Sequence, residues 1–375
     1  VLELARILAG PWCGQTLADL GADVIKVESP EGDDTRKWGP PYIEKDGEQS
    51  AAYFHAANRG KRSIIADFTQ PEGRALVLRL AKQSDVLIEN FKLGGLKKYG
   101  LDYESLKAIN PRLIYCSVSG YGEDGPYRDH KAYDLLIQGE SGLLAINGTA
   151  EEAARVGISV CDIAAGETAY GAILRALFAR ERTGKGRAIE VSLFHTLADW
   201  MNVPYLQFAY GGKVPPRSGL NHPTIAPYGS YVCADGKSVL FSIQNEREWL
   251  MLCRDALGRP DLAIDPRFDS NSRRVSNRDA LNAEIVPIFA SRQRDEMADL
   301  LRAAKIAYGR VSTLDDVATH PQNRYMLVDT PTGPVRMLAP GALVDGEIPS
   351  FRPVPGLGAD TERLRLEFSA SSLPG

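Results

Sequence analysis

The stretch Asp23–Glu28 reads DVIKVE, a short run rich in β-branched apolar residues, and it decides the fold class. Runs of similar character lie around it at Val1–Leu8, Arg62–Asp67 (RSIIAD), Asp85–Glu89 (DVLIE) and Leu113–Val118 (LIYCSV). Helical patterns separate these runs, at Pro11–Leu20 and at Pro71–Gln83, where a proline stands at the first position. Strands that alternate with helices are typical of a parallel sheet with helices on its faces. We therefore predict an α/β fold built on a parallel sheet.

Two stretches near the start of the chain do not follow this alternation. The sequence opens inside the first predicted strand, so we expect the natural chain to begin upstream of Val1, where a targeting segment can lie. Between Ser29 and about Gln49 the chain is polar and rich in Gly and Pro. We predict no regular element in that stretch.

The pattern changes after Gly142. Asp162–Arg182 has the spacing of one long helix, Thr183–Gly186 (TGKG) ends it, and Arg187–Leu193 alternates like a strand before a helical stretch to about Tyr210. Gly211–Thr224 is rich in Gly and Pro, as in a linker. We predict a large domain from residues 1–210, a linker at 211–226, a small α+β domain at 227–311 with a hairpin around Ala234–Gly236, and a return to the large domain at 312–375.

Composition excludes several classes of function. The chain has 375 residues and a formal net charge of −4, which does not suit the backbone of a nucleic acid. Its five cysteines are scattered and form no CxxC pair, so neither a disulfide framework nor a zinc site is indicated. No apolar run is long enough to span a bilayer. We expect a cytoplasmic protein with no nucleic-acid or membrane partner.

Common cofactor motifs are absent. No GxGxxG follows the first predicted strand, and Thr183–Gly186 lacks the upstream glycine of a phosphate-binding loop and ends a helix instead of starting one. HExxH and GxSxG are absent, and the five histidines show no metal-ligand spacing. We expect neither a metal nor a redox cofactor.

Asp162 is the main candidate for chemistry. It stands directly before a run of small residues, Ile163–Ala172 (IAAGETAYGA). The structural interpretation is a helix N-cap, a position that Asp favours. The functional interpretation is an ionised carboxylate at a helix start, which can attack a thioester and form a covalent acyl intermediate.

Cations and one aromatic pair suggest a phosphate-bearing ligand. Asn58–Arg62 (NRGKR) places three cations before a strand, and Lys97, Lys98 and Lys131 are further candidates. For each, a solvated surface charge is the simpler interpretation. Glu89–Phe91 ends a strand with an amide and an aromatic ring, which can bond and stack an adenine or pack in the core. The ends of parallel strands are where such ligands bind.

Several stretches together resemble one family. They are Ala9–Pro11, Leu17–Glu28 (LADLGADVIKVE), Asn58–Ile64, Asp85–Phe91, Tyr133 and Asp134 with Gln138, Asp162, Thr183–Gly186, Arg217–Gly229 and His320–Met326. In this order and spacing they are similar to the CaiB/BaiF (class III) CoA-transferases over nearly the whole chain. The resemblance implies an interlocked homodimer in which each subunit has a Rossmann-like large domain and a smaller domain.

The resemblance also implies site residues. Asp162 is expected to be the nucleophile. Coenzyme A, the substrate thioester, is expected to contact Ala9, Ala66, Thr69, Asn90, Phe91, Lys98 and Lys131, with Tyr133 and Asp134 near the thioester. Some relatives have a glutamine where this chain has Leu8 and an arginine where it has Ser29, so those two contacts are not expected here. Ser242–Trp249 stands where some relatives have a run of glycines over the nucleophile.

The expected activity is the transfer of CoA between small carboxylic acids, with dicarboxylates favoured, through an aspartyl anhydride and an aspartyl thioester. An α-methylacyl-CoA racemase is the alternative enzyme, and it needs two bases flanking the α-carbon. Racemases of the family have a histidine where this chain has Tyr133, and a phenol is a poor base at neutral pH. A CoA-binding protein without catalysis is the alternative outside enzymes.

Overall fold

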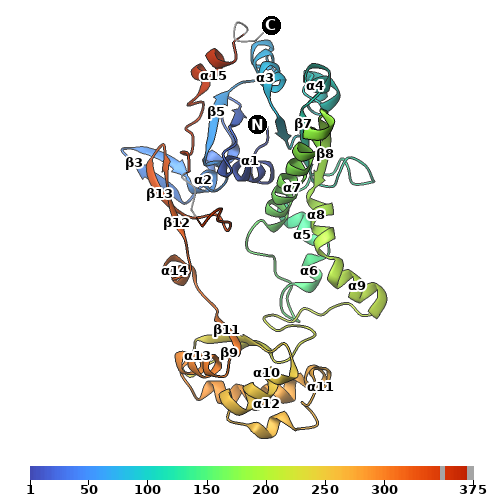
Figure 1. Cartoon of the computed structure of the whole chain (residues 1–375), viewed down its shortest axis with the longest axis vertical. Helices are drawn as coiled ribbons and strands as arrows, with labels where there is room; N and C mark the ends of the chain where they lie inside the picture. The colour runs from blue at the N-terminus through green and yellow to red at the C-terminus, as the bar shows by residue number, and fades with distance from the viewer. Residues whose placement is uncertain (347–350, 370–375) are drawn as a thin grey trace. The chain divides into compact units, whose positions relative to one another are not determined.

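The computed structural model describes residues 1–346 and 351–369. The chain forms two compact units, whose elements are labelled in Figure 1. The first consists of Val1–Leu143, Val156–Val203 and Arg324–Gly375, so both ends of the chain contribute to it. The second consists of Leu144–Arg155 and Pro204–Asn323.

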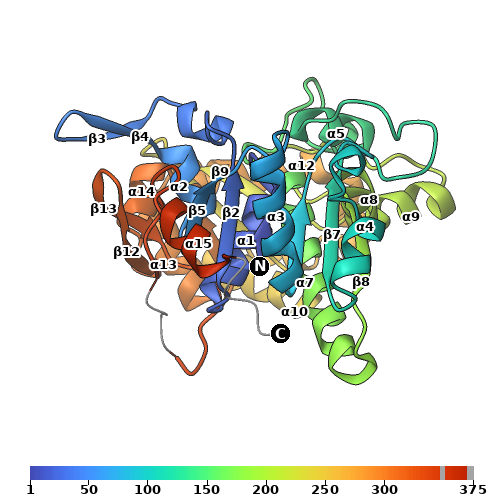
Figure 2. The ribbon, with the colours of Figure 1, turned by 90° about the horizontal axis from the view of Figure 1, so that it is seen from above.

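A six-stranded parallel sheet forms the centre of the first unit. Its order is β5-β2-β1-β6-β7-β8, and Figure 2 shows the strands following one another from β5 and β2 to β7 and β8. The strands are β1 (Leu2–Glu3), β2 (Val24–Glu28), β5 (Lys61–Ile65), β6 (Val86–Glu89), β7 (Ile114–Ser119) and β8 (Arg187–Ser192). The prediction of an α/β protein with a parallel sheet is confirmed. The order reverses at β1, because the chain passes from β1 to β2 on one side and later returns to β6 on the other.

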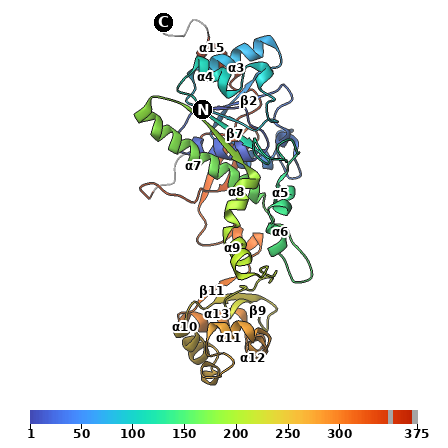
Figure 3. The same cartoon turned by 90° about the vertical axis from the view of Figure 1, so that its right-hand side faces the viewer.

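Helices cover both faces of this sheet, as Figure 3 shows. On one face α1 (Ala9–Asp19), α7 (Val160–Thr183) and α8 (Leu193–Trp200) share an apolar cluster with alternate residues of the strands, such as Ile88 and Cys116. On the other face α3 (Pro71–Gln83), α4 (Tyr103–Ile109) and α15 (Thr361–Glu367) pack on residues such as Leu87. Both sides of the strands are buried, which explains why the runs read as continuously apolar.

Helices α1 and α7 cross at very short range because of Gly166. A methyl group on Gly166 would lie 2.7 Å from the backbone oxygen of Ala9 and 3.0 Å from Cβ of Trp12. The indole N–H of Trp12 donates to Glu167 at 2.7 Å and fixes the crossing further. The run of small residues after Asp162 therefore has a packing role, since it lets the backbone of α1 approach.

A buried network of charges fixes the turn between β1 and α1. Oε1 of Glu3 accepts from the amines of Lys26 and Lys61 at 3.1 and 3.0 Å, and all three side chains are fully buried. Lys26 also pairs with Asp33 at 2.9 Å, and Asp33 accepts the backbone N–H of Ile7 at 3.2 Å. Ile7 has φ = 70°, which is unusual for a β-branched residue. The network thus holds a strained turn that sets where α1 begins.

Two predictions about the first fifty residues are wrong. The strand at Val1–Leu8 ends at Glu3, because the turn at Ile7 leads directly into α1. The stretch Ser29–Gln49 contains a 3-10 helix, η1 (Asp34–Lys37), and a hairpin of β3 (Tyr42–Lys45) and β4 (Glu48–Ala51). Asp46 and Gly47 form the turn with φ of 54° and 84°, and an Asp-Gly pair is a strong hairpin signal that the prediction overlooked.

The second unit has its own core and a three-stranded antiparallel sheet of order β11-β10-β9. Its strands are β9 (Tyr228–Val232), β10 (Ser238–Ser242) and β11 (Ala307–Arg310). The predicted hairpin around Ala234–Gly236 is confirmed, because β9 and β10 flank it as an antiparallel pair. The helices of this unit include α10 (Glu246–Met251), η3 (Leu252–Ala256), η4 (Pro260–Ala263), α11 (Asn271–Ser276), α12 (Arg278–Ala290), α13 (Arg294–Ala303) and α14 (Leu314–Ala318).

The remaining elements are short. They are α2 (Ala52–Asn58), η2 (Lys97–Tyr99), α5 (Asp134–Glu140), α6 (Leu143–Ile146), α9 (Asn202–Gly211), β12 (Tyr325–Thr330) and β13 (Gly333–Leu338). The hairpin of β12 and β13 belongs to the first unit, so the chain returns there after the second unit. Residues 347–350 and 370–375 of the predicted return segment lie outside the described residues.

The crossing of α1 and α7 can be tested with two glycines of the same helix. Gly166→Ala should destabilise the protein by roughly 1–3 kcal/mol, since the new methyl overlaps a backbone oxygen that cannot move aside easily. Gly171→Ala is the matched control, because no atom outside its own helical surroundings lies within 4 Å of its added methyl. The control should gain about 0.5–1 kcal/mol from helix propensity. Denaturant melts that rank the two variants equally would contradict this account of the crossing.

Candidate active site

Asp162 lies in the first turn of α7, but it is not the N-cap. The cap position belongs to Ser159, three residues earlier, and the helix begins at Val160. The prediction that Asp162 caps the helix is therefore wrong, although its placement at the helix start is confirmed. Its side chain is half-buried, and among the described residues no hydrogen-bond donor contacts its carboxylate.

Asp134, the first residue of α5, lies beside it. One oxygen of Asp134 accepts the backbone N–H of Cys161 at 2.7 Å and that of Asp162 at 3.3 Å. The other oxygen accepts from Nε2 of Gln138 at 2.7 Å. Two carboxylates thus meet at the start of α7, and only one of them is hydrogen-bonded.

The surroundings of Asp162 favour its protonated form more than water does. Burial, and then the charge of Asp134, raises the pKa of Asp162 to about 7. Tyr53 of α2 belongs to the same group, because its phenol lies close enough to Ser159, Asp162 and Asp134 for them to act on its ionisation. Burial raises the pKa of Tyr53, so its hydroxyl stays neutral near pH 7. A carboxyl with a pKa shifted this far by specific neighbours is a typical mark of a functional site.

A second group of predicted residues lies where the strand order reverses. Asn90 directly follows β6, and its amide bridges to the turn after β1: Oδ1 accepts the N–H of Arg6 at 2.8 Å and Nδ2 donates to the carbonyl of Arg6 at 2.7 Å. Such a switch point at the carboxyl ends of parallel strands is the usual ligand crevice of an open α/β sheet. Asn90 therefore ties the two strands that border the crevice.

Aromatic rings gather at the same edge of the sheet. Phe91 packs edge-to-face on Phe68 with centroids 5.6 Å apart, and the guanidinium of Arg6 lies 5.4 Å from its ring. Phe68 also contacts Tyr99, whose ring has the amine of Lys98 at 4.8 Å. The structure thus brings together Asn90 and Phe91 from one predicted stretch and Lys98 from another.

The other predicted residues occupy varied positions. Ala9 is buried as the first residue of α1, and Ala66 is buried just after β5. Thr69 follows in the same loop, where its hydroxyl donates to Asp67 at 2.6 Å. Lys131 and Tyr133 are exposed in the segment before α5, and Tyr133 is 71% accessible. In the described residues no hydrogen bond or ion pair joins these two side chains to the rest of the site.

The three cations of Asn58–Arg62 pair with carboxylates of the chain itself. Arg59 pairs with Asp19, and its Nε–Oδ1 distance is 2.9 Å. Lys61 is fully buried against Glu3, and Arg62 pairs with Asp23 and Glu367. Internal carboxylates neutralise all three, so the interpretation of this stretch as a phosphate-binding cluster is wrong.

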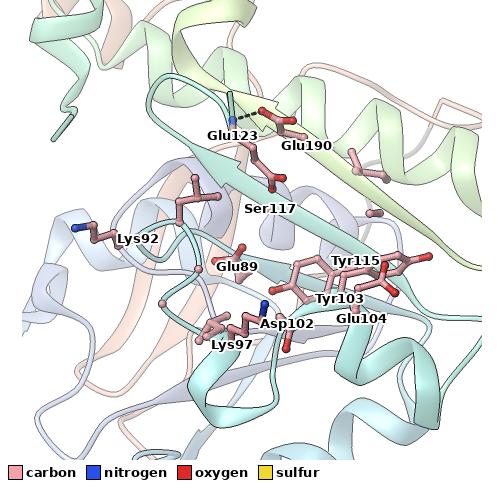
Figure 4. A pocket seen from close by; sticks show the side chains of 16 residues that line it. Glu89, Lys92, Lys97, Asp102, Tyr103, Glu104, Tyr115, Ser117, Glu123 and Glu190 are labelled. Carbon is pink, nitrogen blue, oxygen red and sulfur yellow. Dashed lines mark hydrogen bonds between the residues drawn. The ribbon is translucent and has the colours of Figure 1, made fainter. Parts of the chain in front are cut away.

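A cavity of about 530 Å³ lies between the ends of β6 and β7, β8 and the segment around Lys97. Figure 4 shows the side chains that line it. Five carboxylates line it against two lysines: Glu89, Asp102, Glu104, Glu123 and Glu190 against Lys92 and Lys97. Burial raises the pKa of Glu89, and burial together with the charge of Glu190 raises the pKa of Glu123. This balance does not suit phosphates, and none of the residues predicted to contact CoA lines the cavity.

Sequence reasoning missed three residues of the site: Tyr53, Ser159 and Arg6. Arg6 follows the first strand and carried a signal, because ligands bind at strand ends. Tyr53 and Ser159 gave no sequence signal, because they come together only where α2 lies near the start of α7.

Neither a metal-binding group nor a membrane-spanning helix is found in the described part of the chain. No group of three or more His, Cys, Asp or Glu side chains there is arranged to hold a metal ion. Among the helices of residues 1–346 and 351–369, none combines the length and apolar character that a membrane span requires.

Comparisons with known proteins agree with this geometry. The family model for CoA-transferase family III matches residues 1–361. The succinate–glutarate CoA-transferase of Agrobacterium fabrum is 44% identical over 330 residues, covering 86% of this chain and 81% of the relative. The acetyl-CoA:oxalate CoA-transferase of Acetobacter aceti is 37% identical over 377 residues, covering 99% and 95%.

A solved structure extends the likeness to the fold. A CaiB/BaiF family protein from Brucella suis is 47% identical, with a TM-score of 0.87 over 98% of this chain and 97% of that one. The sequence motifs, the fold and these matches lead to one conclusion: the chain belongs to the CaiB/BaiF family, CoA-transferase family III, and is a CoA-transferase.

Proposed function

We propose that the enzyme moves CoA between two dicarboxylic acids with Asp162 as the nucleophile. The observation that carries this proposal is the pair of carboxylates at the start of α7. Asp162 is half-buried there with no hydrogen-bond donor among the described residues, while Asp134 takes the nearby backbone N–H groups. A carboxylate with few partners is less stabilised than one in water, and it is correspondingly more nucleophilic.

The proposed reaction consists of four acyl-transfer steps that involve the carboxylate of Asp162. An oxygen of Asp162 attacks the thioester carbonyl, the C–S bond breaks, and the CoA thiolate leaves a mixed anhydride. The thiolate then attacks the aspartyl carbonyl, which releases the first acid and forms an aspartyl-CoA thioester. The acceptor carboxylate attacks this thioester and expels the thiolate again. Attack of the thiolate on the acceptor acyl carbon then releases the new acyl-CoA and restores Asp162.

We assign the CoA moiety to the switch point of the sheet. Ala9, Ala66, Thr69, Asn90, Phe91, Lys98 and Lys131 are the proposed contacts, with Tyr133 and Asp134 near the thioester. Support comes from the cluster of Asn90, Phe91 and Lys98 at the carboxyl end of β6. Aromatic rings and the amine of Lys98 lie close together there. The crossing of α1 and α7 supports the link to Asp162. Ala9 contacts Gly166, one helical turn after the nucleophile, so the start of α1 and Asp162 are close neighbours.

Dicarboxylates are the proposed acids because several relatives carry them in their names. The Agrobacterium protein is named for succinate and glutarate, and a mouse protein that is 35% identical over 379 residues is named for succinyl-CoA and glutarate. We propose succinyl-CoA as donor and glutarate as the first acceptor to test.

The transferase and its two alternatives separate in one set of reactions. Succinyl-CoA with glutarate should give glutaryl-CoA and succinate, as followed by mass spectrometry. A 2-methylacyl-CoA in deuterated water should gain no deuterium at the α-carbon, because the chemistry at Asp162 touches only the acyl carbon. Enzyme-dependent α-deuteration without CoA exchange onto any acid would support a racemase instead. CoA binding by calorimetry without turnover in a broad panel would support a non-catalytic protein.

Replacement of the nucleophile tests Asp162 directly. Asp162→Asn should reduce transfer to below about 1% of wild type while CoA binding persists, because the amide cannot form the anhydride. Asp129→Asn, an exposed carboxylate in the segment before α5, is the control and should keep full turnover. Transfer by the Asp162 variant at more than a few per cent of wild type would remove Asp162 from this role.

The same variant has a second, pH-dependent consequence. The pKa of Asp162 is about 7 in the folded protein against about 4 in an unfolded chain. Its charged form therefore costs stability, fully above pH 7 and progressively less as the pH falls to 4. Asp162→Asn lacks this cost and should be more stable than wild type by on the order of 2–4 kcal/mol at pH 8. The advantage should shrink steadily towards pH 4 in denaturant melts. An advantage equal at pH 8 and pH 5 would contradict the raised pKa.

We also propose that two chains interlock as a homodimer, with a large domain from residues 1–210 and 312–375 and a small domain at 227–311 joined by the linker at 211–226. The family resemblance supports this arrangement. Sedimentation velocity at low micromolar concentration should give twice the mass of the 40.9 kDa chain. An active monomer under the same conditions would exclude it.

A further inference from the structure

Helix α7 begins without a cap of its own. A helix leaves its first backbone N–H groups without partners inside the helix, and the residue before it commonly accepts them. Ser159 occupies that position, but its side chain accepts none of them. The N–H groups of Cys161 and Asp162 bond to Asp134 of α5 instead, at 2.7 and 3.3 Å. The cap of α7 thus comes from another element.

Asp134 is itself held in place by a buried amide. Nε2 of Gln138 donates to the second oxygen of Asp134 at 2.7 Å, and Oε1 of Gln138 accepts the N–H of Val156 at 2.9 Å. Gln138 is fully buried one turn along α5. The two side chains therefore join α5 to the segment that leads into α7.

We infer that Asp134 and Gln138 are positioning residues for Asp162, an inference that rests on the proposed role of Asp162 as nucleophile. The backbone N–H groups of a helix's first turn have no partners inside the helix, and they attract nearby carboxylates. Because Asp134 already occupies those groups, the carboxylate of Asp162 stays without a backbone donor. Gln138 keeps Asp134 from turning away.

The cap also acts through its charge. Asp134 opposes the ionised form of Asp162, and this repulsion ends when Asp162 becomes an anhydride or a thioester, because neither carries a charge at that position. Asp134 therefore favours the covalent intermediates over the free carboxylate. A neutral cap of the same shape would hold the helix start but lack this effect.

The groups that face Asp162 come from three elements. They are Asp134 of α5, Tyr53 of α2 and Cys161 of α7 itself, with Asp33 acting on Tyr53 from further away. Burial raises the pKa of both Tyr53 and Cys161, so these two are neutral near pH 7. Among the described residues no cation offsets the charge of Asp134 at Asp162. Asp134 is thus the charged neighbour whose removal isolates the effect.

The test reads the ionisation of Asp162 without using catalysis. In the wild-type background, the stability gained by Asp162→Asn should grow with pH and level off near pH 7, where the folded-state pKa lies. In an Asp134→Asn background it should level off roughly one pH unit lower, because the repelling charge is gone. If the stability gain levelled off at the same pH in both backgrounds, the inference would be overturned. Denaturant melts of the four proteins between pH 4 and pH 9 give this comparison, and circular dichroism confirms that each variant is folded.

Kinetics then separates position from charge. Asp134→Asn should move the acidic limb of kcat/KM to lower pH by a similar amount and reduce the covalent intermediate trapped from acyl-CoA. Gln138→Met removes the anchor but leaves the charge, so it should lower kcat about tenfold or more with little change in KM, and it should move the acidic limb less than Asp134→Asn does. Asp129→Asn is the control for loss of a nearby surface carboxylate. A Gln138→Met enzyme with wild-type kcat would contradict the positioning role. If the pH at which the stability gain levels off differed between the two backgrounds but Asp162→Asn kept full activity, the proposed nucleophile would be refuted. The capping of α7 by Asp134 would still stand.

Discussion

The close crossing of α1 and α7 is the constraint on which the rest of the site depends. The absence of a side chain at Gly166 lets α7 meet the backbone of Ala9 directly. Ala9 is the first residue of α1, and α1 begins where β1 ends at the switch point of the sheet. Asp162 lies one turn before Gly166, or about 6 Å along the helix axis. A single contact between two helices therefore places the proposed nucleophile near the switch point of the sheet, the usual place where open α/β sheets bind ligands.

Buried charge is used in two opposite ways around this crossing. In the network of Glu3, Lys26 and Asp33 every charge has a partner. Burial alone would lower the pKa of Lys26, but the two carboxylates outweigh it and hold that pKa above the usual lysine value. This network stabilises the turn at Ile7 and so fixes the start of α1. At the start of α7 the arrangement is reversed, because burial and a second carboxylate destabilise the ionised Asp162. The protein thus gives up stability at the carboxylate that we propose as the nucleophile, and a well-satisfied network nearby keeps the framework rigid.

The same geometry explains why this site favours acyl transfer over chemistry at the α-carbon. Nucleophilic attack needs one carboxylate with few hydrogen bonds. In the proposed mechanism that carboxylate is Asp162, because Asp134 of α5 accepts the N–H groups at the start of α7. Racemisation needs two bases on opposite sides of the α-carbon. Tyr133 stands at the position of the second base, and its exposed phenol is a weak base by nature. The acidic cavity beside β6 is likewise unsuited to CoA, whose phosphates require donors and cations instead of carboxylates.

The sequence by itself determined the parallel sheet, the long helix after Gly142, the hairpin at Ala234–Gly236 and the family. Each of these follows from local periodicity or from motifs of fixed spacing, and such local patterns can be read directly from a sequence. It also indicated Asp162, Asn90, Phe91 and Lys98, because strand ends and helix starts can be located from the pattern. Only the tertiary structure decided that Asp162 is not the cap of its helix, that the cations of Asn58–Arg62 are neutralised internally, and that Asp134 accepts the free N–H groups at the start of α7. These features depend on which side chains of distant segments meet, and burial, ion pairing and capping between elements follow from packing and not from spacing along the chain.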